Sequence, residues 1–195
     1  MTVTSHYQSM EDRDGMLRSG MAIGANEAWD MLDELLERMG AEQKREGKQE
    51  LVLTRVLDAP RNLVWKAWTD PKHLVQWWGP KGFTNPVCEV DVRPGGIILI
   101  HMRAPDGKVY PMKGEFTEVV VPERLAFLSG AMDEKGNLLF EVLNIVTFTE
   151  QAGKTKLTMH ARVVNATAAA APYLAGMEIG WTQSLERLEA FVTRA

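Results

Sequence analysis

Five ionisable side chains lie where they could carry out acid–base chemistry. All of them fall in strand-like segments of the second half of the chain: His101, Arg103, Tyr110, Glu141 and His160. Two such groups could converge as acid and base beside a bound carbonyl group. Because side chains alternate along a strand, His101 and His160 lie on the face opposite their apolar neighbours, which is typical of surface histidines. Tyr110, Arg103 and Glu141 therefore remain the catalytic candidates.

The sequence contains no motif for nucleophilic catalysis, phosphate binding or metal binding. No Ser-His-Asp set, glycine-rich phosphate loop or paired-carboxylate motif can be identified. The single cysteine, Cys88, cannot form an internal disulfide, and with four dispersed histidines it matches no zinc spacing. We interpret Cys88 as a small buried hydrophobic residue and expect neither a metal nor a cofactor.

Composition limits the classes of partner. The chain has 195 residues, of which 45% are hydrophobic and 25% charged, as in globular proteins. Its net charge of -4, without a basic cluster, argues against nucleic acid as a partner. No run of eighteen apolar residues and no cationic, apolar start occurs, so we expect no membrane span, no secretory signal and a cytoplasmic location.

The elements that must position these residues follow from periodicity and turn signals. A strand is predicted from Glu50, a helix over 61–70, and a short helix from Asp70-Pro71 to Trp77-Trp78. Strand-like runs with short polar connections then predict an antiparallel sheet, and the chain closes on a helix from about Pro172 to Thr193. The fold class is α+β: a curved antiparallel sheet wrapped around a long C-terminal helix, with a cavity between them.

Several short sequence words occur in this same order. They are Asp58-Ala59-Pro60-Arg61, Val64-Trp65-Lys66-Ala67-Trp68-Thr69-Asp70-Pro71, Trp77-Trp78-Gly79-Pro80, Arg93-Pro94-Gly95-Gly96, Pro105-Asp106-Gly107, Pro122-Glu123-Arg124-Leu125 and Leu157-Thr158. Together they resemble the START-like (SRPBCC, helix-grip) superfamily over residues 48–195. Within it the chain is most similar to the branch named after activators of the heat-shock-protein-90 ATPase (AHSA-like), whose bacterial members are mostly uncharacterised.

The resemblance implies a fold more strongly than a function, since this scaffold hosts carriers, cyclases, hydrolases, sensors and chaperone partners. The main hypothesis is a carrier or sensor that binds a small apolar or aromatic molecule between the sheet and the last helix. One alternative is a chaperone co-factor or protein-interaction module, as the name of the branch suggests. A second alternative is an enzyme of cyclase or hydrolase type.

Alternation and helical spacing predict which residues line the cavity. The expected set is Ile98, Ile100, Met102, Phe116, Phe127, Phe148, Met159, Met177 and Trp181. Methionine side chains fit ligands of varied shape, but they also fill gaps, so a closed cavity is the competing interpretation. Trp77 and Trp78 are predicted either to form a mobile rim over the cavity mouth or to be packing anchors in the core.

The N-terminal region repeats part of the C-terminal helix. Gly20, Met21, Ile23, Gly24 and Leu32 match the residues 156 positions later, and the pattern predicts a helix over about 13–39 followed by a polar linker. We interpret residues 1–47 as an extension that resembles the closing helix of a second START-like domain without its sheet. It could cover the apolar outer row that begins with Ile97 and Leu99, in the same chain or in a homodimer.

Overall fold

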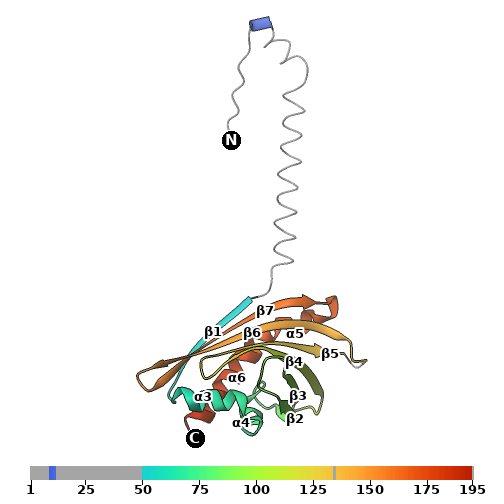
Figure 1. The fold of residues 1–195 in the computed structure, drawn as a ribbon. Coiled ribbons are helices and arrows are strands. Elements are labelled where there is room, and N and C mark those ends of the chain that lie inside the picture. The colour runs from blue at the N-terminus through green and yellow to red at the C-terminus, as the bar shows by residue number, and fades with distance from the viewer. Residues whose placement is uncertain (1–8, 12–49, 134, 195) are drawn as a thin grey trace. The chain divides into compact units, whose positions relative to one another are not determined.

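Figure 1 shows the computed structural model of the chain, which describes residues 9–11, 50–133 and 135–194. Its contacts divide the chain into two compact units, Met1–Gly47 and Lys48–Ala195. The helix predicted over 13–39 and the linker after it lie outside the described residues. The fold that positions the site is therefore that of residues 50–194.

Within residues 50–166, seven strands form one antiparallel sheet in the order β1-β7-β6-β5-β4-β3-β2. The strands are β1 (Glu50–Leu57), β2 (Thr84–Val90), β3 (Ile97–Arg103), β4 (Val109–Val120), β5 (Arg124–Met132), β6 (Leu138–Gln151) and β7 (Lys154–Ala166). The sheet curves over the C-terminal helix in Figure 1. The predicted α+β helix-grip fold is confirmed.

Two helices connect β1 to β2. Helix α3 (Arg61–Thr69) begins after Pro60, and α4 (Pro71–Trp77) is capped by Asp70, whose carboxylate accepts a hydrogen bond from the backbone nitrogen of Lys72 at 2.9 Å. Proline suits the first turn of α4 because its missing N–H has no partner there. Both helices lie where the sequence predicts them.

The C-terminal helical region is broken, which corrects the prediction of one helix from about Pro172 to Thr193. It consists of a 3-10 turn η1 (Ala168–Ala170), a short helix α5 (Ala171–Ala175) and a long helix α6 (Met177–Val192). Gly176 ends α5 and starts α6. Glycine loses more conformational entropy in a helix than any other residue and therefore destabilises a helix interior. A break between the two helices is favourable at this position for that reason.

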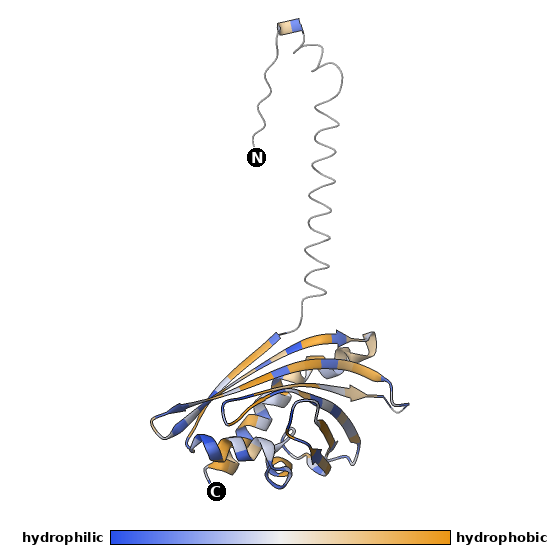
Figure 2. Cartoon of the chain, viewed as in Figure 1, coloured by the Kyte–Doolittle hydropathy of each residue, from blue (hydrophilic) through white to orange (hydrophobic). Residues whose placement is uncertain are grey.

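Helix α6 packs against the concave face of the sheet through one apolar stripe. The three-and-four spacing predicts a stripe of Met177, Trp181, Ser184, Leu188 and Phe191. Ser184 and Leu188 are buried, as are Leu185 and Val192, and the other three members of the stripe are partly buried against the core. Apolar residues are concentrated on the strands, whereas the β6–β7 turn is hydrophilic (Figure 2). No helix in the described part of the chain is both long and apolar enough to cross a membrane.

Four tryptophans form the centre of the packing between α3, α4 and α6. The ring centroids of Trp68 and Trp77 are 4.7 Å apart, and those of Trp78 and Trp181 are 5.2 Å apart. Trp77 is completely buried and Trp78 is 5% exposed, so both are packing anchors and neither forms a mobile rim. Trp77 also donates a hydrogen bond from Nε1 to the carbonyl oxygen of Ala67 at 2.8 Å.

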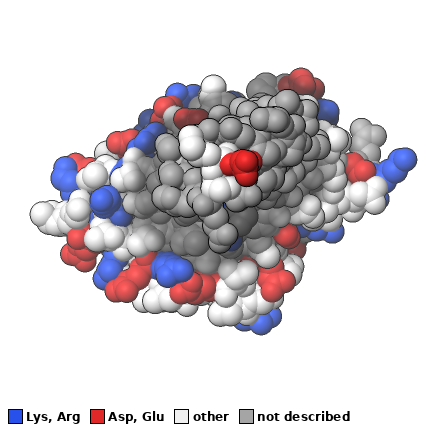
Figure 3. Space-filling view, turned by 90° about the horizontal axis from the view of Figure 1, so that it is seen from above, with Lys and Arg blue, Asp and Glu red and all other residues white. Residues whose placement is uncertain are grey.

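The outer face of the sheet is mixed in character. Ile97 is 57% exposed and Leu99 is half-buried, as alternation predicts for this row. Seen from above, Lys and Arg are interspersed with Asp and Glu around the margin of the view (Figure 3). The large exposed apolar residues include Val52 and Val56 on β1. Strand β1 forms one edge of the sheet, whereas Ile97 on β3 lies near the other edge.

Cys88 gives a direct test of this packing, because it faces the same side of the sheet as its partner Ile100. Burial raises the pKa of the Cys88 thiol from 9.0 to about 11, which suppresses the reactive thiolate at pH 8. Native protein should therefore react with Ellman's reagent more than tenfold more slowly than urea-unfolded protein. Equal rates in the two states would contradict this placement.

Candidate ligand-binding pocket

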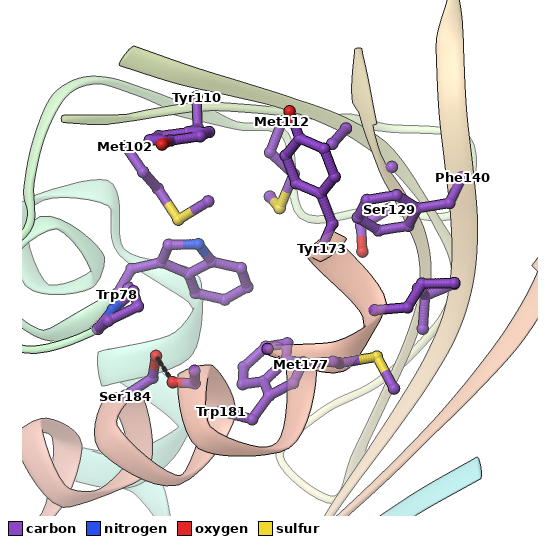
Figure 4. A pocket seen from close by; sticks show the side chains of 18 of the residues that line it. Trp78, Met102, Tyr110, Met112, Ser129, Phe140, Tyr173, Met177, Trp181 and Ser184 are labelled. Atoms are coloured by element: carbon purple, nitrogen blue, oxygen red, sulfur yellow. Dashed lines mark hydrogen bonds between the residues drawn. The ribbon is translucent and has the colours of Figure 1, made fainter. Parts of the chain in front are cut away.

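A cavity of about 320 Å³ lies between the concave face of the sheet and the C-terminal helices. Strands β3 to β6 form one wall, and α5, α6 and the loop after α4 form the other (Figure 4). The lining side chains are mainly aromatic, aliphatic and thioether groups, among them Trp78, Met102, Tyr110, Met112, Phe140, Tyr173, Met177 and Trp181. This pocket is open to the outside and strongly apolar.

Two aromatic groups define its ends. At one end Trp78 and Trp181 make an edge contact, and Trp181 also stacks on Trp68 with centroids 6.2 Å apart. At the other end the Tyr173 ring lies 6.4 Å from Tyr110 and 6.0 Å from Phe140. Tyr173 is 37% exposed, so this second group lies at the mouth of the pocket.

The loop that contributes Trp78 and Pro80 is fixed to α6 by one cation. The Arg187 guanidinium donates hydrogen bonds to the carbonyl oxygens of Gly79 at 2.8 Å and Pro80 at 2.9 Å, and longer ones to those of Trp78 and Gln76. Burial lowers the pKa of Arg187 from its ordinary value. The loop turns at Gly79, whose φ of +91° favours glycine.

The loop and α6 are joined again at Lys81. Its backbone nitrogen donates to Gln183 Oε1 at 3.0 Å, and its ammonium group forms an exposed ion pair with Glu186. The hydrogen bond and positive charge of Lys81 lower the pKa of Glu186. The hydrogen bonds of Arg187 and of the Lys81 backbone thus hold this wall from outside the pocket, and the described lining of the cavity includes no charged side chain.

The lining residues predicted from the sequence fall into three groups. Trp78, Met102, Met177 and Trp181 line the pocket. Ile98, Ile100, Phe116 and Phe127 lie around a second cavity of only about 10 Å³, which is too small for a ligand. Trp77, Phe148 and Met159 are buried in the core and line neither of these two cavities.

The catalytic candidates are not brought together. Tyr110 lines the pocket, but Arg103 shares the outer row of β3 with Ile97 and His101. Glu141 alternates with Phe140 and Val142, both of which line the pocket, so it lies on the outer face. Of the three weak catalytic candidates, only Tyr110 therefore lies in the described lining of this pocket, and these residues form no acid–base pair there.

The two histidines lie on the outer face as predicted. His101 is opposite Pro111 in the outer row of the sheet, and it is half-buried. His160 Nε2 lies 3.5 Å from a carboxylate oxygen of Glu50, with its side chain 40% exposed. Neither side chain lines the pocket.

Two polar residues on the sheet side of the pocket were not among the predicted lining residues. Ser129 on β5 and Asn144 on β6 both line it, and both are buried. Alternation along the strands could have identified both residues. Ser129 occupies the next inward position after Leu125 and Phe127, and Asn144 occupies an inward position between two buried apolar residues of β6. A polar residue at such a position needs a partner inside the fold.

Comparisons with known proteins agree with this geometry. Solved structures with the same fold include a Mycobacterium smegmatis protein at 31% identity (TM-score 0.65, covering 76% of this chain and 93% of that chain). Another, from Nitrosomonas europaea, has 27% identity (TM-score 0.63, covering 74% and 94%). A third is the AHSA1 protein of Silicibacter pomeroyi at 26% identity (TM-score 0.61, covering 72% and 95%).

The sequence itself was also compared with curated proteins and with models of protein families. No curated protein matches the chain. A family model described as "Activator of Hsp90 ATPase homolog 1-like protein" matches residues 58–193, which include strands β2 to β7 and helices α3 to α6. The chain therefore belongs to the family of Activator of Hsp90 ATPase homolog 1-like proteins.

Proposed function

We propose that this protein binds a small, uncharged, largely apolar molecule in the pocket between the sheet and α6, as a carrier or sensor. The observation that supports it is an open pocket of about 320 Å³ whose described lining includes no Lys, Arg, His, Asp or Glu. Small-molecule sites are typically concave, mostly apolar and of at least this size. An uncharged wall disfavours ionised ligands, because they would lose their hydration without compensation.

The side chains of the pocket suit a flat ligand. The rings of Trp78 and Trp181 offer apolar faces and edges to an aromatic molecule. Met102, Met112 and Met177 surround the same space, and their flexible thioethers can adapt to ligands of different outline (Figure 4). The pocket therefore favours aromatic or other planar molecules over long chains.

Two other functions of the scaffold are less well supported. Enzymatic acid–base chemistry needs a base near the substrate, and the described lining offers only hydroxyl and amide groups. A chaperone co-factor is favoured by the family description, but this role calls for an apolar docking surface. Val52 and Ile97 are both exposed, but Val52 lies on β1 and Ile97 on β3. Four strands lie between β1 and β3 in the sheet, so these two residues do not belong to one patch.

The proposal can be tested with protein purified from its own host. Native mass spectrometry should show a retained small molecule together with the number of subunits. A bare protein, combined with no thermal shift across a panel of neutral aromatic metabolites, would contradict the proposed function.

A variant that fills the pocket gives a sharper test. Ala131 lies between Met112 and Phe140 in the sheet, and all three residues line the pocket. Ala131→Phe should place a ring in the cavity and weaken binding of a neutral aromatic probe such as 2-naphthol by about tenfold or more, since lost contacts of about 1.4 kcal/mol suffice. Affinity is measured by equilibrium dialysis.

Gly180→Ala is the matched control for this variant. A Cβ atom at Gly180 would meet the Pro80 ring at 3.9 Å, an ordinary contact, and would leave most of the cavity open. Its affinity should stay within a factor of about three of the original. If Ala131→Phe folds and binds as tightly as Gly180→Ala, the ligand lies elsewhere.

A further inference from the structure

The pocket contains one polar feature that an apolar ligand would not explain, the Ser129–Asn144 pair. Both residues occupy inward positions of neighbouring strands, and Asn144 lies opposite Phe127 in the register of β5 and β6. Asn144 is completely buried and Ser129 is 9% exposed. Burial of an amide is unfavourable unless its hydrogen bonds are made, so their pattern is informative.

The nitrogen of the Asn144 amide is well supplied with acceptors. Nδ2 donates to Ser129 Oγ at 2.9 Å and to the Val142 carbonyl oxygen at 3.1 Å, and the Phe127 carbonyl oxygen lies at 3.5 Å. Two backbone carbonyls beside this atom require it to be the NH₂ group, because a carbonyl oxygen there would be repelled. The orientation of the amide is therefore fixed.

The other half of the amide is left incomplete. Asn144 Oδ1 is buried and has no hydrogen-bond partner among the described residues. Ser129 Oγ accepts the bond from Asn144, and within the described part of the chain it has no acceptor for its own hydrogen. The pair thus offers one acceptor and one donor beside the apolar side chains of Val142 and Phe140 on the wall formed by β5 and β6.

We infer that the ligand of this pocket carries a neutral hydroxyl group, as in a phenol or an alcohol, that binds to the Ser129–Asn144 pair. A hydroxyl group matches the pair because it can donate to Asn144 Oδ1 and accept from Ser129 Oγ at once. This inference rests on the proposed function and specifies its ligand class. An ammonium or carboxylate group fits less well, since the described lining holds no counter-charge.

The inference predicts a strong preference between two ligands of the same shape. A site built to hydrogen-bond a hydroxyl discriminates against an analogue without it, because the buried polar groups of the site are then left unpaired. The probes are 2-naphthol and 2-methylnaphthalene, which differ by exchange of the hydroxyl for a methyl group. The native protein should bind 2-naphthol about tenfold more tightly in equilibrium dialysis, as expected for one or two neutral hydrogen bonds.

Variants locate the origin of that preference. Asn144→Leu keeps the branched shape of the side chain and removes the amide, and should reduce the preference for 2-naphthol to less than about twofold. Ser129→Ala removes a single hydroxyl and should lower the preference even if Asn144→Leu fails to fold. Thr69→Val is the matched control, because it also removes one hydroxyl group, but Thr69 donates to the Trp65 carbonyl oxygen within its own helix and does not line the pocket.

The outcomes separate the inference from the proposed function. Binding of both probes with equal affinity would overturn the inference and indicate that water satisfies Asn144, while leaving the apolar pocket as the binding site. A preference that survives in Ser129→Ala and Asn144→Leu would also overturn it. Failure of both probes to bind would contradict the proposed function and, with it, the inference.

Discussion

Replacement of Trp77 by alanine is expected to destabilise the domain by about 3–5 kcal/mol, the range for truncating a buried aromatic side chain. Trp77 is completely buried, and its ring contacts Trp68 and Trp78. Its removal would also leave the Ala67 carbonyl oxygen without the Nε1 donor that now lies 2.8 Å away. The measurement is the free energy of unfolding from urea titration.

Trp65 supplies the matched control for this loss. It has the same side chain and lies on the neighbouring helix α3, but it is only half-buried, with its ring against Phe148 at 5.5 Å. Trp65→Ala should therefore cost clearly less than Trp77→Ala. If the two variants lose equal stability, the tryptophan cluster is not the centre of the packing that this structure indicates.

Replacement of Arg187 by methionine is expected to lower the free energy of unfolding by about 1.5–2 kcal/mol and to weaken ligand binding. Hydrogen bonds to charged groups contribute up to about 3 kcal/mol, and the partial exposure of Arg187 reduces that value. Methionine keeps the apolar stem but removes the donors to the carbonyl oxygens of Gly79 and Pro80. Because these residues form one wall of the pocket, their release should also lower affinity for 2-naphthol.

Glu186→Gln is the control on the adjacent position of α6. It breaks the ion pair with Lys81, which is solvent-exposed on both sides. Exposed ion pairs contribute little, so stability and affinity should both remain unchanged. Loss of affinity in Glu186→Gln but not in Arg187→Met would show that Lys81, and not Arg187, holds the loop.

Local pattern was sufficient to predict the framework of the fold. The alternation of Ile97 to Arg103 predicted which side chains face the helix, because strand geometry places successive residues on opposite faces. The capping residue Asp70 with Pro71 likewise predicted the start of α4. The break at Gly176 was missed, since a single glycine is compatible with a continuous helix and only the packing of α5 and α6 decides.

The position of the cavity was harder to predict than the direction of each side chain. Phe148 does face inward, but the rings of Trp65 and Trp68 from α3 lie against it and fill the space there. Met102 faces inward as well, and the pocket reaches it. Which inward residues border empty space depends on where the helices cover the sheet, and this is set by contacts between distant residues such as Arg187 and Gly79.

The central claim, that a neutral aromatic ligand binds in the pocket under α6, is tested most directly by NMR of methionine methyl groups during titration with 2-naphthol. Met102, Met112 and Met177 line the pocket, whereas Met159 is completely buried outside it. We predict large chemical-shift changes at the three pocket methionines and almost none at Met159. Unchanged signals from Met102, Met112 and Met177 at saturating 2-naphthol would contradict the claim.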